Sequence, residues 1–131
     1  MAESSISVIV VDDEIELANL FKEYIQTCSL NAISFTDSLL ALEYLKDNSK
    51  KFSLLMTDLR MPKMSGIGLA TEVRKINENI KIILITAFMT EDLIDDVRFK
   101  SARIDQVVQK PVKFAALKES LRQLLTQPLA T

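Results

Sequence analysis

Five short apolar runs alternate with five stretches of helical periodicity along this chain. The runs occupy residues 6–11, 31–35, 53–57, 82–86 and 106–109. Runs this short predict strands, whereas apolar residues spaced three or four apart predict the helices that follow them. Strands that alternate with helices form a parallel sheet covered on both faces. Right-handed crossovers leave few arrangements of such a sheet, and we predict a three-layer α/β sandwich with strand order 2-1-3-4-5.

The predicted helices are amphipathic, and several begin at a residue that favours a helix start. Thr36 or Asp37 can cap the second helix, Ser65 the third and Thr90 the fourth, because short polar side chains accept hydrogen bonds from the first turn. The apolar residues expected to face the sheet are Leu17, Leu20, Phe21, Tyr24 and Ile25 in the first helix, Leu39, Leu42 and Leu45 in the second, Leu69, Ala70, Val73 and Ile76 in the third, Leu93, Ile94 and Val97 in the fourth, and Phe114, Leu117, Leu121, Leu124 and Leu125 in the fifth.

Length and composition are those of one globular domain. We expect residues 1–131 to form a single unit with its core at about 5–125. The net charge of −2, without a basic stripe, makes nucleic-acid binding by this domain unexpected. The longest apolar run, residues 82–89, is far shorter than the ~20 residues of a membrane span. The start of the chain lacks the pattern of a signal peptide, so we expect a cytoplasmic protein that contacts no membrane.

Cysteine and histidine are scarce. The single cysteine, Cys28, rules out a disulfide within the chain and suits a reducing compartment. The chain contains no histidine, which excludes Ser-His-Asp and Cys-His catalysis and histidine metal sites.

Polar side chains stand where four of the predicted strands end. Asp12 and Asp13 follow the first strand, Asp58 the third, Thr86 the fourth and Lys110 the fifth. In the expected strand order these four strands are neighbours, and ligands of an open parallel sheet collect beyond the carboxyl ends of its strands. The five side chains are therefore expected to converge.

Three carboxylates gathered at one point repel one another unless a proton or a cation neutralises them. Oxygen ligands without histidine or cysteine favour Mg²⁺, which keeps positions open for phosphate oxygens. Lys110 supplies a second positive charge and Thr86 a hydroxyl donor to a phosphoryl oxygen. Asp58 is then placed to attack phosphorus and form an aspartyl phosphate.

Each of these residues taken alone has an ordinary structural interpretation. Asp12 and Asp13 can cap the first helix, Lys110 can be a surface lysine before a turn, and Thr86 can be a plain strand residue. Asp58 is harder to dismiss, because an acid directly after a buried strand is costly to bury unpaired. Gly66 is expected to allow a tight turn into the third helix. The sequence has no phosphate-cradling glycine loop, which disfavours nucleotide binding.

With these residues assembled, the chain resembles a response-regulator receiver domain, the phosphoacceptor module of two-component signalling, whose fold is flavodoxin-like. The resemblance covers about residues 5–125 and rests on four motifs: Val10-Val11-Asp12-Asp13-Glu14, Thr57-Asp58-Leu59-Arg60-Met61-Pro62 with Gly66, Thr86-Ala87, and Lys110-Pro111.

The resemblance implies a role for each of these residues. Asp58 would accept a phosphoryl group from a histidine kinase, a phosphotransfer protein or a small donor such as acetyl phosphate, and would later lose it by slow autodephosphorylation. Asp13, Asp58 and the backbone carbonyl of Arg60 would bind Mg²⁺, with Asp12 assisting. The peptide bond before Pro111 would be cis. A downstream protein or a second copy would read the face made by the fourth helix, the fifth strand and the fifth helix.

The chain departs from the family's pattern at two positions. Val107 stands where receiver domains carry Tyr or Phe, so we expect the signal to pass mainly through Thr86 and the segment at Phe88 and Met89. Arg103 stands where a glycine is common, so the loop before the fifth strand is expected to differ. Arg60 and Phe88 lie two residues beyond Asp58 and Thr86, where the family tunes phosphoryl lifetime.

Two other functions compete with this interpretation. The first is a receiver-like interaction module that works without phosphorylation, which Val107 favours and the five polar residues oppose. The second is a metal-dependent phosphatase of similar fold. Such an enzyme would need a second acid two residues after Asp58, and Arg60 occupies that place.

Overall fold

The computed structural model describes residues 6–87 and 97–125. Its five strands form one parallel sheet in the order β2-β1-β3-β4-β5, as predicted. The strands are β1 (Ser7–Val11), β2 (Asn31–Phe35), β3 (Leu54–Asp58), β4 (Lys81–Thr86) and β5 (Gln106–Gln109). The helices are α1 (Ile15–Thr27), α2 (Ser38–Asn48), the short 3₁₀ helix η1 (Ser49–Lys51), α3 (Gly66–Ile76), α5 (Val97–Ala102) and α6 (Phe114–Leu124).

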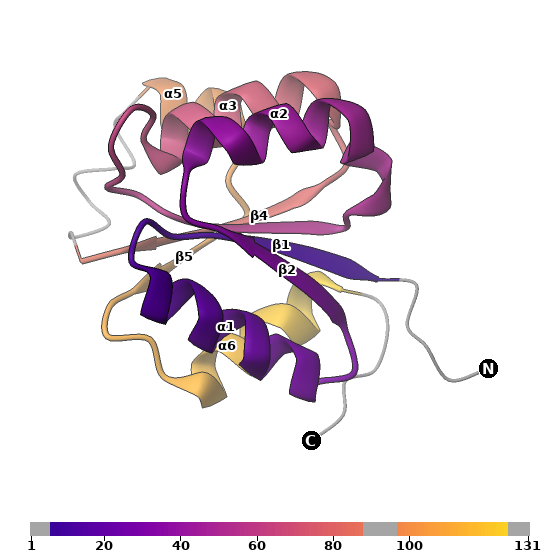
Figure 1. Cartoon of the computed structure of the whole chain (residues 1–131), viewed down its shortest axis with the longest axis vertical. Coiled ribbons are helices and arrows are strands. Elements are labelled where there is room, and N and C mark those ends of the chain that lie inside the picture. Colours follow the sequence, from indigo (N-terminus) through magenta and orange to yellow (C-terminus); the bar gives the residue numbers. More distant parts are fainter. Residues whose placement is uncertain (1–5, 88–96, 126–131) are drawn as a thin grey trace.

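The sheet lies between two layers of helices (Figure 1), with α2, α3 and α5 over one face and α1 and α6 over the other. Successive side chains of a strand point to opposite faces. Accordingly, Val8 and Val10 of β1 join the core beneath α1 and α6, whereas Ile9 and Val11 join the core beneath α2 and α3. The predicted three-layer α/β sandwich is confirmed.

Two of the predicted helix caps can be checked, and both are present. The Asp37 carboxylate accepts hydrogen bonds from the N–H groups of Leu39 (2.8 Å) and Leu40 (3.2 Å) at the start of α2. The Ser65 hydroxyl accepts one from Gly68 at 3.1 Å at the start of α3. The predicted cap at Thr90 lies outside the described residues.

Five residues predicted to face the sheet are instead exposed: Leu20, Leu39, Ile76, Val97 and Phe114. Other apolar residues of the same helices fill the core in their place. Ala41 and Leu45, for example, are fully buried in α2, whereas Leu39 is 44% exposed. Leu93 and Ile94 lie outside the described residues.

The register of the sheet aligns the strand ends. Val11 lies opposite Thr57, so the next residues along β1 and β3 are Asp12 and Asp58. On the other side of β3, Asp58 lies opposite Ile85, the residue before Thr86. The four central and edge strands β1, β3, β4 and β5 therefore end together at one rim of the sheet.

Two backbone features bear on the predictions: the peptide bond before Pro111 and the conformation of Arg103. The Lys110–Pro111 peptide bond is cis, as predicted. Arg103 adopts a left-handed conformation with φ of 53°, which is the conformation that favours glycine. The loop before β5 thus keeps a glycine-type backbone without a glycine. No helix among residues 6–87 and 97–125 is long and apolar enough to cross a bilayer.

Candidate functional site

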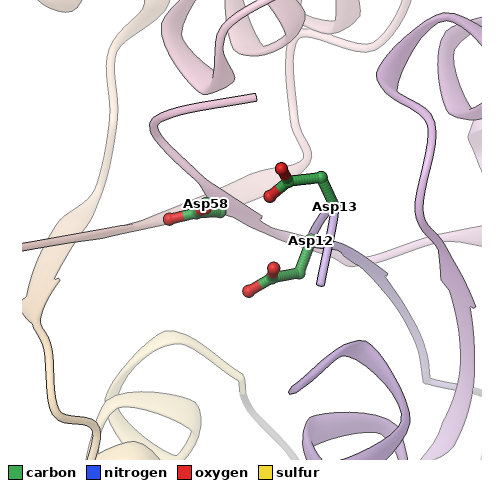
Figure 2. Close-up of side chains that lie close together, drawn as sticks. All are labelled: Asp12, Asp13 and Asp58. Atoms are coloured by element: carbon green, nitrogen blue, oxygen red, sulfur yellow. The ribbon is translucent and has the colours of Figure 1, made fainter. Parts of the chain in front are cut away.

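Three carboxylates meet at the rim formed by the strand ends. Asp12, Asp13 and Asp58 each offer an oxygen, and these oxygens lie within 4.8 Å of one another. Figure 2 shows the three side chains converging from the end of β1 and the end of β3. Asp12 and Asp58 are buried, at 2% and 7% exposure, whereas Asp13 is exposed. The site is therefore a partly buried acidic cluster with one side open to solvent.

Asp12 has one satisfied oxygen and one unsatisfied oxygen. Its Oδ1 accepts a hydrogen bond from the N–H of Glu14 at 2.9 Å, just before α1 begins. Its Oδ2 is buried and has no hydrogen-bond partner among the described residues. Buried polar atoms are nearly always paired. The cap of the first helix considered for Asp12 is absent, since Glu14 is the N-cap and no side chain in the described part of the chain caps it. The bond to Glu14 accounts for only one of the two Asp12 oxygens.

Lys110 pairs with Asp58. Its Nζ lies 3.2 Å from Asp58 Oδ1, and both side chains are largely buried. The lysine is held in place by its own backbone, because its N–H donates to the Thr86 carbonyl at 2.8 Å where β5 runs beside β4. The ion pair therefore depends on the sheet rather than on a flexible loop.

A hollow of about 260 Å³ opens beside this ion pair, lined by Asp58, Arg60, Thr86, Ala87 and Lys110. Thr86 is almost fully buried. Every sequence-predicted site residue thus lies at one place: the three acids in the cluster, and Thr86, Arg60 and Lys110 around the hollow that Asp58 shares. The hollow is large enough for a tetrahedral oxyanion and has a lysine ammonium at its wall.

Burial and neighbouring charges shift the pKa values of Asp12, Asp58 and Lys110 at the rim. Burial is the main cause that raises the pKa of Asp12 to about 6, and the nearby Asp58 and Asp13 raise it further. Burial also raises the pKa of Asp58, although the Lys110 ammonium partly opposes the shift. Burial alone would lower the pKa of Lys110, but the attraction of Asp58, Asp12 and Glu14 outweighs it and the pKa is raised. The cluster therefore resists holding all its negative charge without a cation.

The rim fits a hard divalent cation. Three carboxylates, one with an orphaned buried oxygen, form a set of oxygen donors without nitrogen or sulfur. Such donors suit Mg²⁺, which binds through few carboxylates and retains waters. A bound Mg²⁺ would favour the ionised forms of Asp12 and Asp58, and so oppose the rise in pKa that burial and the neighbouring acids cause.

Gly66 is close to the site for a reason that the sequence did not reveal. We expected it to supply a tight turn, but no described glycine has a positive φ, and the left-handed residue of this loop is Lys63 with φ of 70°. Instead, a Cβ at position 66 would lie 2.1 Å from the backbone oxygen of Asp58. The Gly66 N–H also donates to Leu59 at 2.8 Å. Gly66 therefore lets the start of α3 pack directly on the backbone of the phosphoacceptor candidate.

The loop after Asp58 is tied to α2 by contacts that sequence reasoning missed. Lys63 Nζ lies 2.8 Å from Asp37 Oδ2, and this ion pair joins the loop to the cap of α2. Both residues look like ordinary loop residues in the sequence, and only the fold shows that they meet. Phe88, suggested as a modulator of phosphoryl lifetime, lies outside the described residues.

Comparison with known proteins agrees with this geometry. The family model described as "Response regulator receiver domain" matches residues 8–122. The chain is 27% identical over 125 residues to the transcriptional regulatory protein ZraR of Klebsiella oxytoca, an alignment that covers 95% of this chain and 27% of that protein. It therefore spans little more than a quarter of that relative's length. Over 118 residues it is 27% identical to the response regulator receiver protein CpdR of Brucella abortus, covering 90% of this chain and 95% of CpdR.

A solved structure gives a similar result. The response regulator protein TrrA of Thermotoga maritima, crystallised in complex with Mg²⁺ and BeF, superposes with a TM-score of 0.78 at 32% identity. The match covers 92% of this chain and 99% of TrrA.

Proposed function

The chain belongs to the response regulator receiver domain family of two-component signalling, and from this premise we propose that Asp58 accepts a phosphoryl group with Mg²⁺ bound at Asp12, Asp13 and Asp58. The observation that carries the proposal is the convergence at one rim of three carboxylates and the ammonium of Lys110, 3.2 Å from Asp58. A structural salt bridge would need one acid and one base. This rim has two further acids, and a buried oxygen of Asp12 has no hydrogen-bond partner within residues 6–87 and 97–125.

In the proposed phosphoryl transfer, Asp58, Lys110 and Thr86 have separate roles. An Asp58 carboxylate oxygen attacks phosphorus, and an O–P bond forms as the P–N bond to the donor's phosphohistidine breaks, its electron pair leaving with the imidazole nitrogen. Lys110 stabilises charge on a phosphoryl oxygen, and the Thr86 hydroxyl donates to another. The donor in this proposal is a sensor histidine kinase, a phosphotransfer protein or a small donor such as acetyl phosphate; the chain has no histidine to carry the phosphoryl group itself.

Mg²⁺ would be held by carboxylate oxygens of Asp12, Asp13 and Asp58, together with the backbone carbonyl of Arg60. Its contribution would be to offset the negative charge that gathers on the phosphoryl oxygens. Arg60 lines the same hollow as Asp58, which suits this role.

Phosphorylation would act as a switch rather than as enzymatic turnover. A phosphoryl group adds about −1.5 to −2 charges at pH 7. Drawing Thr86 and Lys110 toward that charge would displace the ends of β4 and β5, and with them the face formed by α5, β5 and α6. A downstream protein or a second copy would read this face, and slow hydrolysis of the acyl phosphate would end the signal.

The test is phosphorylation of the purified chain by acetyl phosphate with Mg²⁺, followed by intact mass and by two-dimensional NMR. We expect a mass increase of one phosphoryl group that is lost in Asp58→Asn and in the presence of a chelator. Asp47→Asn, which removes an exposed acid on α2, is the matched control and should be modified as the parent is. An unmodified parent, or equal labelling of Asp58→Asn, would contradict the proposal.

One observation favours a second function. Val107 replaces the aromatic residue of the family, as expected for a receiver-like module that binds partners without phosphate. In that case the parent would give neither a mass shift nor NMR changes with Mg²⁺ and acetyl phosphate, yet would still bind its partner after Asp58→Asn.

A further inference from the structure

A small apolar cluster lies beneath the rim, separate from the two main cores. We call it the subrim cluster; it consists of buried Ile67 and Leu84 with the partly buried Leu59, Phe99, Ile104 and Val107 packed against them. It gathers side chains from α3, β4, α5 and β5 and from the loop after Asp58. The cluster is therefore the point where the strands that carry the site meet the helices of one layer.

The subrim cluster lies on the same face of β4 as Thr86. Alternate residues of a strand share a face, so Leu84 and Thr86 point toward the same layer of helices, as does Ile82 in the core under α3. Leu84 also lies opposite Val107 in the sheet register. A displacement of Thr86 along or across β4 therefore reaches Leu84 first, and then the side chains packed on it.

Phe99 links this cluster to the protein surface. It packs on the cluster from α5 and is half-buried, while Val97 on the same helix is 78% exposed and Arg98 and Lys100 are exposed. The Phe99 ring therefore packs on the subrim cluster, while other residues of its own helix, α5, are exposed to solvent.

The far end of α5 is held by an independent anchor. The buried Arg74 of α3 donates from Nε to the carbonyl of Ala102 and from Nη2 to that of Arg103, each at 3.0 Å. These bonds hold the carboxyl-terminal end of α5 in place, so we expect a change at the rim to reach this helix through contacts nearer its start. Among the described residues of α5, Phe99 makes such a contact.

We propose that Phe99 is a positioning residue that transmits the state of Asp58 and Thr86 to the surface of α5, in place of an aromatic residue at position 107. The inference rests on the proposed phosphoacceptor function, and it assigns to α5 the aromatic contact that β5 lacks. The ring need not touch the phosphoryl group, since it acts through Leu84 and Thr86.

The test uses the full chain with Mg²⁺ and beryllofluoride as the phosphoryl mimic. Fluorine NMR reports whether the mimic binds, and amide NMR shifts of residues 97–102 report whether α5 responds. We expect Phe99→Leu to bind beryllofluoride with an affinity within twofold of the parent, while the α5 shifts on binding fall by half or more. Phe99→Tyr, which retains the ring, should respond as the parent does.

The control is Tyr44→Leu, which removes a ring of a partly exposed aromatic on α2, away from the subrim cluster. It should leave the α5 shifts unchanged. The inference is wrong if Phe99→Leu keeps the full α5 response, if Phe99→Tyr loses it, or if Tyr44→Leu reduces it equally. A parent that shows no bound-fluoride signal would instead refute the proposed function, so the two failures are distinguishable.

Discussion

The two ends of the sheet differ in whether their buried charged groups have hydrogen-bond partners. At the amino ends of β4 and β5, the buried guanidinium of Arg74 donates to the carbonyls of four residues and lies 3.7 Å from Asp105. At the carboxyl ends, Asp12, Asp13 and Asp58 crowd one another, and a buried oxygen of Asp12 has no partner in the part of the chain that the structure describes. The first arrangement is complete in the chain alone, and the second is not.

This difference separates a structural charge from a functional one. A buried charge surrounded by hydrogen-bond partners holds its surroundings together, and its removal leaves those partners unpaired. A cluster of like charges costs stability in the free chain and regains it when a ligand neutralises the cluster. This contrast supports the binding site that we propose at the acidic rim, whereas Arg74 fastens α3 to the segments that precede β4 and β5.

The largest effect is expected at the structural end. Arg74→Met should lower the free energy of unfolding by about 3–5 kcal/mol, because it removes the donor of four backbone carbonyls. Urea denaturation measures the change. Arg122→Met, on an arginine whose side chain is 60% exposed, is the control and should change stability by at most about 0.5 kcal/mol. If both variants lost equal stability, the comparison between the two ends would fail.

At the acidic rim we expect stability to depend on pH, and Asp12 makes a contribution that can be isolated. The pKa of Asp12 is raised from 3.8 to about 6 in the folded chain. The folded state therefore holds this proton more tightly than the unfolded state, and the resulting stabilisation is full below pH 4 and lost as the pH rises through 6. Without Mg²⁺, the loss should amount to about 3 kcal/mol, at about 1.36 kcal/mol per pKa unit.

Asp12→Asn isolates this contribution, because the amide cannot ionise. Measured by urea denaturation across pH 4 to 7 in a chelator, the variant should be more stable than the parent at neutral pH and similar at pH 4. Added Mg²⁺ should stabilise the parent more than the variant. The opposite result would be a parent that gains stability relative to Asp12→Asn between pH 4 and 6. It would show that folding does not raise the pKa of Asp12.

A smaller effect is expected where α3 touches Asp58. Gly66→Ala places a methyl group 2.1 Å from the Asp58 backbone oxygen, so backbone must move. We expect a loss of about 1–3 kcal/mol from overpacking, together with weaker Mg²⁺ binding in a calorimetric titration. Gly68→Ala is the matched control, since its Cβ meets only side-chain atoms of Met64 and Ser65. It should be neutral or stabilise by up to about 1 kcal/mol.

Features set by local chemistry could be predicted from the sequence, whereas contacts between residues far apart in the chain could not. Strand ends that carry Asp12, Asp58, Thr86 and Lys110 are visible in a linear pattern, because strand order alone makes them neighbours. The contact that requires a glycine at position 66 was not predicted, since it is with a backbone atom eight residues earlier and no local pattern encodes it.

The Arg74 anchor was missed entirely for the same reason. An arginine in the last turn of an amphipathic helix looks like a solvated charge that favours the helix dipole. Its partners, Glu78, Ile80, Ala102 and Arg103, are backbone carbonyls, which every residue has, so nothing in their side chains marks them. Burial of a charge by backbone acceptors becomes visible only once the chain is folded.

The smallest expected effect shows whether the rim depends on the helix beside it. Ser65→Ala removes the hydroxyl that accepts from Gly68 at 3.1 Å, and loss of such a cap costs about 1 kcal/mol. Ser65→Asn keeps a capping side chain and should restore most of it. Because Gly66 rather than Ser65 contacts Asp58, we expect Mg²⁺ affinity to stay within about twofold, a change of no more than about 0.4 kcal/mol. A larger loss of affinity in Ser65→Ala, rescued in Ser65→Asn, would mean that the cap of α3 positions the acidic cluster, and that the functional end of the sheet is braced by structure much as the Arg74 end is.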